Sequence, residues 1–174
     1  LPGQVVMDQG TADFREASSA AERSPLAGKL FDVDGVSGVF FGYDFVTITK
    51  EDALDWAHLK PAILAAIMEH FMAGHPVMSD AGNSGFDEDD EAEFFDESDE
   101  AIVTTIKELI DTRVRPAVAQ DGGDITFRGF KEGTVFLHMK GACAGCPSST
   151  ATLKHGIQNL LQHFIPEVQQ VEAV

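Results

Sequence analysis

Cys143 and Cys146 are the only cysteines of the chain and are separated by two residues, in the run Gly141-Ala142-Cys143-Ala144-Gly145-Cys146-Pro147-Ser148-Ser149. A Cys-x-x-Cys pair can bind one metal ion or one edge of an iron–sulfur cluster, or it can alternate between dithiol and disulfide. A cluster or a closed zinc site usually takes four ligands. The pair therefore supplies half of such a site, and further ligands have to come from elsewhere.

The residues around the two cysteines indicate a loop that leads into a helix. Pro147 suits the first helical position, where its missing N–H would have had no partner in any case. Cys146 then falls at the N-cap, where free N–H groups and the helix dipole favour a thiolate. Gly141 and Gly145 let the backbone bend tightly and leave room beside the sulfurs. We therefore expect a loop that closes around a bulky cofactor.

Length and composition exclude several classes of function. The chain has 174 residues, of which 44% are hydrophobic, and its formal net charge is −17. So negative a chain is a poor partner for nucleic acid or for an anionic membrane surface, and no apolar run is long enough to span a bilayer. Two cysteines are too few for a disulfide-stabilised scaffold, and a working Cys-x-x-Cys pair suits a reducing compartment. Because the first residue is Leu1 rather than Met, we expect a fragment or a processed form.

Residues 79–100 differ from the rest of the chain. They hold eleven of the 29 acidic residues and none of the 12 basic ones. A run of like charges repels itself and stays extended, which predicts a flexible acidic linker. Phe86, Phe94 and Phe95 are unusual in such a run, and a segment that docks on one of the domains is the alternative.

The patterns on either side of this stretch predict two small domains. In the first we expect a strand over Leu1–Met7, a helix from Ser24-Pro25, a hairpin over Val36–Phe41 and Phe45–Thr49, and a helix from Trp56 to Gly74. In the second we expect a helix from Ile102 to Val114 with a kink at Pro116, a hairpin over Ile125–Phe130 and Thr134–Met139, the cysteine loop, a helix ending at Pro166, and a strand over Val168–Val174. The predicted fold class is α+β, with domains at residues 1–78 and 101–174 joined by the acidic linker 79–100.

Several motifs together resemble one known family, the Nfu iron–sulfur cluster proteins. Arg115-Pro116-Ala117, Asp121-Gly122-Gly123-Asp124 and the cysteine run are similar to the NifU C-terminal domain. The first half resembles the Nfu N-terminal domain through Ser24-Pro25-Leu26-Ala27, Leu30-Phe31, Gly35-Val36, Val39-Phe40-Phe41-Gly42, Asp44-Phe45, Thr47-Ile48-Thr49-Lys50, Trp56, Leu59-Lys60-Pro61 and His70-Phe71. The resemblance covers nearly the whole chain outside the linker.

The resemblance implies an iron–sulfur cluster carrier or scaffold and no enzyme. It implies that a [4Fe–4S] cluster, with [2Fe–2S] as the alternative, is bridged between two chains by Cys143 and Cys146 of each. Two copies of the pair supply the four thiolates that a cluster takes. The implied partners are an upstream assembly scaffold as donor and apo iron–sulfur enzymes as recipients, in a bacterial cytoplasm or a mitochondrial matrix. Asp121 and Asp124 are expected to fix the turn rather than to bind iron, and no residue is expected to be catalytic.

Other readings of the cysteine pair remain open from the residues alone. A thiol–disulfide oxidoreductase also places Cys-x-x-Cys at a helix N-terminus, but here a hairpin precedes the motif and we expect no βαβ crossover. A structural zinc site needs two further ligands, for which His155 is a candidate with strained geometry. The two cysteines could also be buried as small apolar side chains without further function.

The histidines and aromatic residues are better explained by packing than by chemistry. We expect His70 and His163 at the edge of a core, and His58 and His75 at the surface. His138 lies close to the cysteine loop and is the one histidine worth testing, although a half-buried strand residue is the better explanation. We expect the Met and Phe residues from Met68 to Met72 to be core. Phe40, Phe41 and Phe45 are expected to be core as well, with a recognition surface as the alternative.

Overall fold

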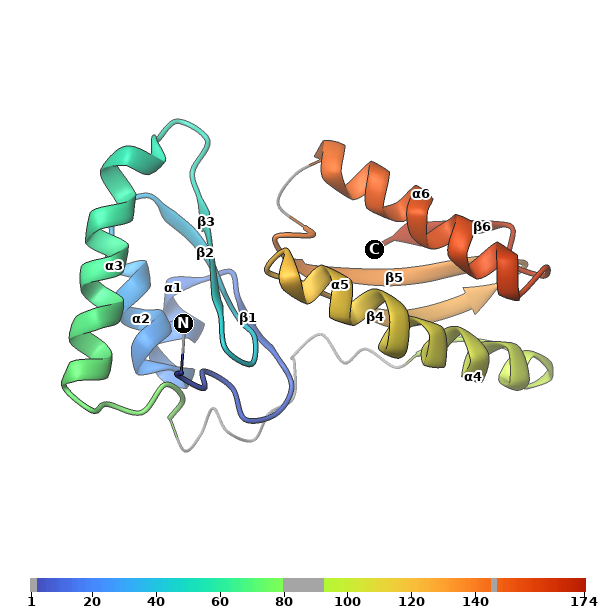
Figure 1. Cartoon of the computed structure of the whole chain (residues 1–174), viewed down its shortest axis with the longest axis horizontal. Coiled ribbons are helices and arrows are strands. Elements are labelled where there is room, and N and C mark those ends of the chain that lie inside the picture. Colours follow the sequence, from blue (N-terminus) through green and yellow to red (C-terminus); the bar gives the residue numbers. More distant parts are fainter. Residues whose placement is uncertain (1–2, 80–92, 145–146) are drawn as a thin grey trace. The chain divides into compact units, whose positions relative to one another are not determined.

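The computed structural model describes residues 3–79, 93–144 and 147–174, and of residues 147–149 it describes only the backbone. The chain divides into two compact units, unit 1 (Leu1–Asp87) and unit 2 (Glu88–Val174). Each unit combines helices with one three-stranded sheet (Figure 1). The predicted α+β fold class is therefore confirmed. Most of the acidic run, residues 80–92 with Phe86, lies outside the described residues.

Unit 1 consists of a small antiparallel sheet with helices packed against it. Its strands follow the order β1-β2-β3, and helix α2 contacts both strand β2 and helix α3. The elements are β1 (Ala12–Phe14), α1 (Ala17–Arg23), α2 (Pro25–Phe31), β2 (Val36–Phe41), β3 (Val46–Lys50) and α3 (Trp56–Met72). The predicted hairpin and both predicted helices are thus present.

Local chemistry explains where helices α2 and α3 of unit 1 begin. Ser24 caps α2, because its Oγ accepts a hydrogen bond from the Ala27 N–H at 3.0 Å, and Pro25 follows as the first helical residue. Asp55 caps α3 in the same way, with its Oδ1 3.0 Å from the Ala57 nitrogen. These caps confirm the helix starts predicted from the sequence.

Two predictions for unit 1 are wrong. In place of a strand over Leu1–Met7, the described residues 3–10 are irregular, and the edge strand is β1. Val6 and Met7 are nevertheless buried, and both donate their N–H groups to the Tyr43 carbonyl. The apolar side chains of Val6 and Met7 are therefore explained by their burial in an irregular segment and not by a β-strand.

The second wrong prediction concerns the methionines of α3. Met68 is 62% exposed and Met72 is 84% exposed, so neither belongs to the core. The helix turns its other side inward, and Leu59, Ile63, Ala66, Ile67 and His70 are its buried residues. Phe40 and Phe41, in contrast, are buried as expected, and Phe41 packs edge-on against Phe14.

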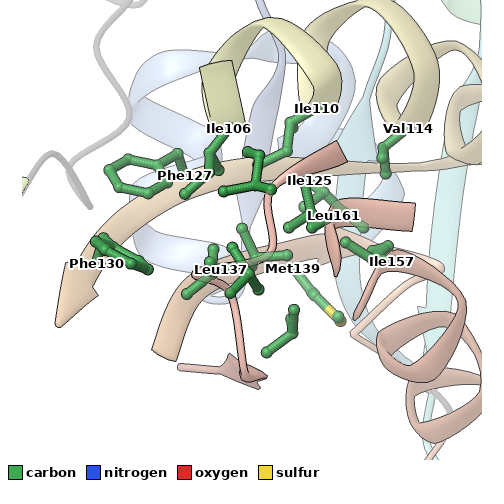
Figure 2. Close-up of a cluster of buried hydrophobic side chains, with 14 of the residues drawn as sticks. Ile106, Ile110, Val114, Ile125, Phe127, Phe130, Leu137, Met139, Ile157 and Leu161 are labelled. Atoms are coloured by element: carbon green, nitrogen blue, oxygen red, sulfur yellow. The ribbon is translucent and has the colours of Figure 1, made fainter. Parts of the chain in front are cut away.

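Unit 2 also holds a three-stranded sheet, in the order β4-β5-β6. Its elements are η1 (Glu97–Asp99), α4 (Glu100–Leu109), a π-helical turn η2 (Ile110–Val114), α5 (Arg115–Gln120), β4 (Gly123–Lys131), β5 (Thr134–Gly141), α6 (Pro147–Phe164) and β6 (Gln170–Ala173). Apolar side chains from the helices and from one face of the sheet meet in a single core (Figure 2). The labelled members are Ile106, Ile110, Val114, Ile125, Phe127, Phe130, Leu137, Met139, Ile157 and Leu161.

The kink predicted at Pro116 takes the form of a π-helical turn. Proline has no N–H to donate and its ring collides with the carbonyl four residues earlier, so a regular helix cannot pass through it. The chain widens into η2 just before Arg115 and resumes as α5. Ile106, Ile110 and Val114 all stay buried across this change, so the apolar stripe is not interrupted.

Strand β6 pairs in parallel with β5, and the sequence did not reveal this pairing. Helix α6 connects the two strands, so β5, α6 and β6 form a βαβ crossover. The expectation that the cysteine motif lacks such a crossover is therefore wrong. Two parallel strands need a long connection, because the chain has to return to the end of the sheet at which the first strand began. A tight turn can join only antiparallel strands.

Both described ends of the predicted linker are attached to a unit. The Ser79 nitrogen and hydroxyl both donate hydrogen bonds to the Arg23 carbonyl at the end of α1. At the other end, Phe94 forms a β-bridge with Gly129 of β4, and residues 97–100 are already helical. The prediction of a flexible linker is thus wrong for residues 93–100, because an aromatic anchor outweighs the like charges around it.

Candidate functional site

The cysteine loop connects the end of β5 to the start of α6 and is fixed by backbone hydrogen bonds. The Ala142 N–H donates to the Gly122 carbonyl, and the Ala144 N–H donates to the Gly141 carbonyl, each at 3.1 Å. Gly141 has a φ of 61°, which a glycine adopts without strain. The first half of the loop therefore has a defined backbone, held against the turn that precedes β4.

Cys143 lies in a narrow space between the loop and strand β4. It is 6% exposed and joins the edge of the core of unit 2. A Cβ on Gly123 would overlap the Cys143 Sγ and would lie 2.9 Å from the Lys140 carbonyl oxygen. Gly123 thus provides the space that the sulfur occupies. On the other side, the Thr150 hydroxyl of α6 donates a hydrogen bond to the Cys143 carbonyl at 2.8 Å.

The surroundings of Cys143 keep its thiol protonated. Burial, and then the negative charges of Asp121 and Asp124, raise the pKa of the Cys143 thiol to about 11. The thiolate is the form that binds metals, so a metal ion or cluster has to displace this proton. A cation placed at the sulfur would also offset the two nearby carboxylates.

Arg115 ties the turn beside the cysteine loop to helix α5. Its Nε and Nη2 atoms donate to the two carboxylate oxygens of Asp124, both at 2.8 Å, and its Nη1 donates to Asp111 at 3.2 Å. Asp124 also accepts the Ile125 N–H. The hydrogen bond with Asp124 holds the pKa of Arg115 above its usual value. Asp124 therefore fixes the turn, as predicted, and its carboxylate is already engaged.

The remaining candidate residues are placed as follows. Gly145 and Cys146 lie outside the described residues, and Pro147 is the first residue of α6. His138 is half-buried on β5, His155 is exposed on α6, and His70 is buried in unit 1. Across the described side chains, no group of three or more His, Cys, Asp or Glu residues could hold a metal ion together. The zinc-site alternative with His155 thus receives no support from the described part of the chain.

Sequence reasoning missed the contributions of Gly123, Thr150 and Arg115. The sequence shows Gly123 only as part of a turn cluster, and its closeness to Cys143 follows from its pairing with Gly141 across β4 and β5. Arg115 and Asp124 are nine residues apart, a distance at which no helical or strand periodicity indicates a contact. Their joint presence in the motifs that resembled the NifU domain was the available signal.

Two family descriptions match the chain, one in each unit. The family described as "Scaffold protein Nfu/NifU N terminal" matches residues 1–74, and the "NifU-like domain" family matches residues 106–172. The chain belongs to the Nfu family. The Nfu signature therefore extends over both units, and the cysteine loop falls within its NifU-like part.

Curated relatives agree with this assignment. A human protein named "NFU1 iron-sulfur cluster scaffold homolog, mitochondrial" is 49% identical over 178 residues, covering 100% of this chain and 66% of the relative. Proteins of the same name from Drosophila sechellia and Drosophila virilis are 49% identical, covering 100% of this chain and 59% and 56% of the relatives. The chain thus spans about two thirds or less of the length of these relatives. Among the helices in its described part, none combines the length and apolar character needed to cross a bilayer.

Proposed function

We propose that this Nfu-family chain carries an iron–sulfur cluster as cargo, bound by the thiolates of Cys143 and Cys146, and delivers it to proteins that lack their cluster. The main support is the position of Cys143, whose sulfur lies in a space made by Gly123 on a loop that backbone hydrogen bonds hold. Thiolate donors suit iron–sulfur clusters. The names of the relatives, which are cluster scaffolds, support the same cargo.

The number of cysteines favours a cluster shared between two chains. Each chain has two cysteines, whereas a cluster usually takes four thiolates. Two copies related by a two-fold axis supply four. The proposed cargo is therefore a [4Fe–4S] cluster that bridges a homodimer, and a bridging [2Fe–2S] cluster is the alternative to be distinguished by iron content.

A cluster held at the boundary between two chains can be released by separating them. Transfer then exchanges the cysteines of this chain for those of the recipient, and no residue here needs to act as an acid, a base or a nucleophile. We propose apo iron–sulfur enzymes as recipients and an upstream assembly scaffold as donor. Because the relatives are named mitochondrial, we propose the mitochondrial matrix as the location.

The alternative function, a thiol–disulfide oxidoreductase, needs a thiolate that attacks a disulfide at neutral pH. Burial and two neighbouring carboxylates act against this at Cys143 by raising its pKa. The family match and the names of the relatives give the alternative no support either. This chain shares the Cys-x-x-Cys pair and the βαβ crossover through α6 with such oxidoreductases.

A transfer experiment tests the carrier proposal. The cluster-loaded chain is mixed anaerobically with the apo form of a [4Fe–4S] hydro-lyase, in the presence of a chelator that captures free iron. We expect hydro-lyase activity to recover, and to stay absent when Cys143→Ser or Cys146→Ser replaces the loaded chain. Recovery that the chelator abolishes would show that the chain releases iron rather than a cluster, and would contradict the proposal.

A further inference from the structure

The segment Glu93–Phe94 lies along the outer edge of strand β4, the first strand of the sheet in unit 2. The Phe94 N–H donates to the Arg128 carbonyl at 3.2 Å, and the Phe130 N–H donates to the Phe94 carbonyl at 2.9 Å. Together these bonds make Phe94 a short parallel extension of the sheet, opposite Gly129. Strand addition of this kind takes its affinity from backbone hydrogen bonds and its specificity from side-chain pockets.

Gly129 and Phe136 form the place where the Phe94 ring sits. A Cβ on Gly129 would meet three ring atoms of Phe94 at 2.5–2.6 Å, so the ring lies directly over the bare backbone of β4. The Phe136 ring on the neighbouring strand is 5.2 Å from that of Phe94, between centroids. The pairing of β4 with β5 shifts register between Phe127 and Gly129, which bends the edge at this point. The site therefore selects an aromatic side chain.

A positive charge selects the residue before the aromatic one. The Lys107 ammonium group on α4 forms an ion pair with the Glu93 carboxylate. It also lies 5.4 Å from the centroid of the Phe127 ring, which holds it near the edge of β4. An acidic residue followed by an aromatic one thus satisfies both parts of the site.

We propose that the edge of β4 at Gly129 is a binding groove for an extended acidic–aromatic peptide segment, and that Glu93–Phe94 of the same chain is its occupant. The occupant covers an edge whose unpaired N–H and C=O groups would otherwise be open to other strands. It also fixes the point where the connection to unit 1 leaves unit 2. Gly129, which pairs with Phe94, is six residues along β4 from Gly123, which lies beside the cysteine loop. Six strand residues span about 20 Å.

Hydrogen exchange at the Phe130 amide tests this proposal in the full-length chain. In Phe94→Ala we expect this amide to exchange about tenfold faster than in the unmodified chain, because its acceptor is no longer held in place. Phe95→Ala is the matched control: Phe95 is the adjacent residue of the same type and is 38% exposed, against 43% for Phe94. It should leave the Phe130 amide unchanged. Equal exchange in the two variants would overturn the proposal.

Gly129→Ala perturbs the same contact from the strand and keeps Phe94 intact. Its backbone is not in the left-handed region, so the added methyl group acts through the Phe94 ring. We expect the same loss of protection at Phe130. If the Phe94→Ala chain folds poorly, Gly129→Ala tests the proposal in its place. Unchanged protection of the Phe130 amide in Gly129→Ala would contradict the proposed groove.

A peptide with the sequence of residues 93–98, Glu-Phe-Phe-Asp-Glu-Ser, tests the groove in trans. Added to the Phe94→Ala chain, it should restore protection at Phe130, and a peptide with alanine in place of its first phenylalanine should not. Restoration by both peptides would show that the site does not select an aromatic residue. That result would overturn the proposal, whereas self-association of the Phe94→Ala chain on gel filtration is expected, because the uncovered edge can then pair with another strand.

Discussion

Gly123 is the residue on which the position of Cys143 depends most directly. A side chain there would occupy the space of the Cys143 sulfur and would crowd the carbonyl of Lys140 and the nitrogen of Cys143 itself. The nearest atoms are the Cys143 sulfur and backbone atoms, rather than the end of a long flexible side chain. Relief therefore requires the cysteine loop itself to move.

We predict that Gly123→Ala displaces Cys143 and lowers cluster loading severalfold, with a loss of about 1–3 kcal/mol in the free energy of unfolding of unit 2. Iron content after anaerobic reconstitution and urea unfolding measure the two effects. Gly156→Ala on α6 is the control, because a Cβ there meets nothing within 4 Å and alanine favours a helix. If Gly123→Ala loaded as much iron as Gly156→Ala, the role given to Gly123 would be wrong.

The buried ring of His70 makes the stability of unit 1 depend on pH. The ring is 1% exposed, and its Nε2 has no hydrogen-bond partner among the described residues. Burial, and then the charges of His75 and Lys29, lower the pKa of His70 from its usual value. The unfolded chain therefore binds a proton more readily than the folded one as the pH falls below about 6.5. The stability that neutral His70 contributes is present above that pH and is lost as the pH falls through the lowered folded pKa.

We predict that unit 1 unfolds at lower urea concentration at pH 5.5 than at pH 7.5, and that His70→Leu reduces this difference. Trp56 is the only tryptophan and lies in α3, so its fluorescence reports on unit 1. His58→Leu, at an exposed position of the same helix, is the control and should keep the full difference. An unchanged difference in His70→Leu would contradict the assignment.

At the scale of elements, the sequence identified most helices and strands but not how they pair. Caps such as Ser24-Pro25 and the apolar stripe from Ile106 to Val114 act locally, so they could be predicted. The parallel pairing of β6 with β5 could not, because Val168–Val174 carries no information about its partner strand. Nor could the anchor at Phe94, which depends on Gly129 and Phe136 more than thirty residues away. The exposure of Met68 and Met72 in α3 could not be predicted, because their spacing fits either face of the helix.

The link between α5 and β4 through Arg115 and Asp124 predicts a clear stability effect. We predict that Arg115→Gln destabilises unit 2 by about 1–3 kcal/mol, since Asp124 then keeps a buried carboxylate without its partner. The Arg115 side chain is 37% exposed, so we expect less than a fully buried pair would lose. Hydrogen exchange at the Leu137 amide measures the effect. Lys154→Gln breaks a surface pair with Glu172 and serves as control, and an equal loss in both variants would contradict the prediction.

At the scale of the whole molecule, the cysteine loop and the groups that support Cys143 all belong to unit 2. Unit 1 is nevertheless part of the Nfu family match. We propose a division of labour, in which unit 2 holds the cluster and unit 1 recognises partners.

Deletion of residues 1–77 tests that division. We predict that the shortened chain loads iron as well as the full chain, because the supports of Cys143 remain, and that it delivers the cluster more slowly to at least one recipient. Transfer rates to several apo-enzymes, measured side by side for the two chains, give the answer. If delivery to every recipient stayed the same, unit 1 would have no role in recognition.

Anaerobic reconstitution with iron and sulfide, followed by iron and sulfide analysis, Mössbauer spectroscopy and gel filtration, tests the central claim most directly. A [4Fe–4S] cluster bridged by Cys143 and Cys146 of two chains predicts about two irons per chain, on a dimer that separates when the cluster is removed. About one iron per chain on such a dimer would identify a [2Fe–2S] cluster instead. A monomer without iron, whose two cysteines reduce disulfides, would contradict the carrier function and favour the oxidoreductase.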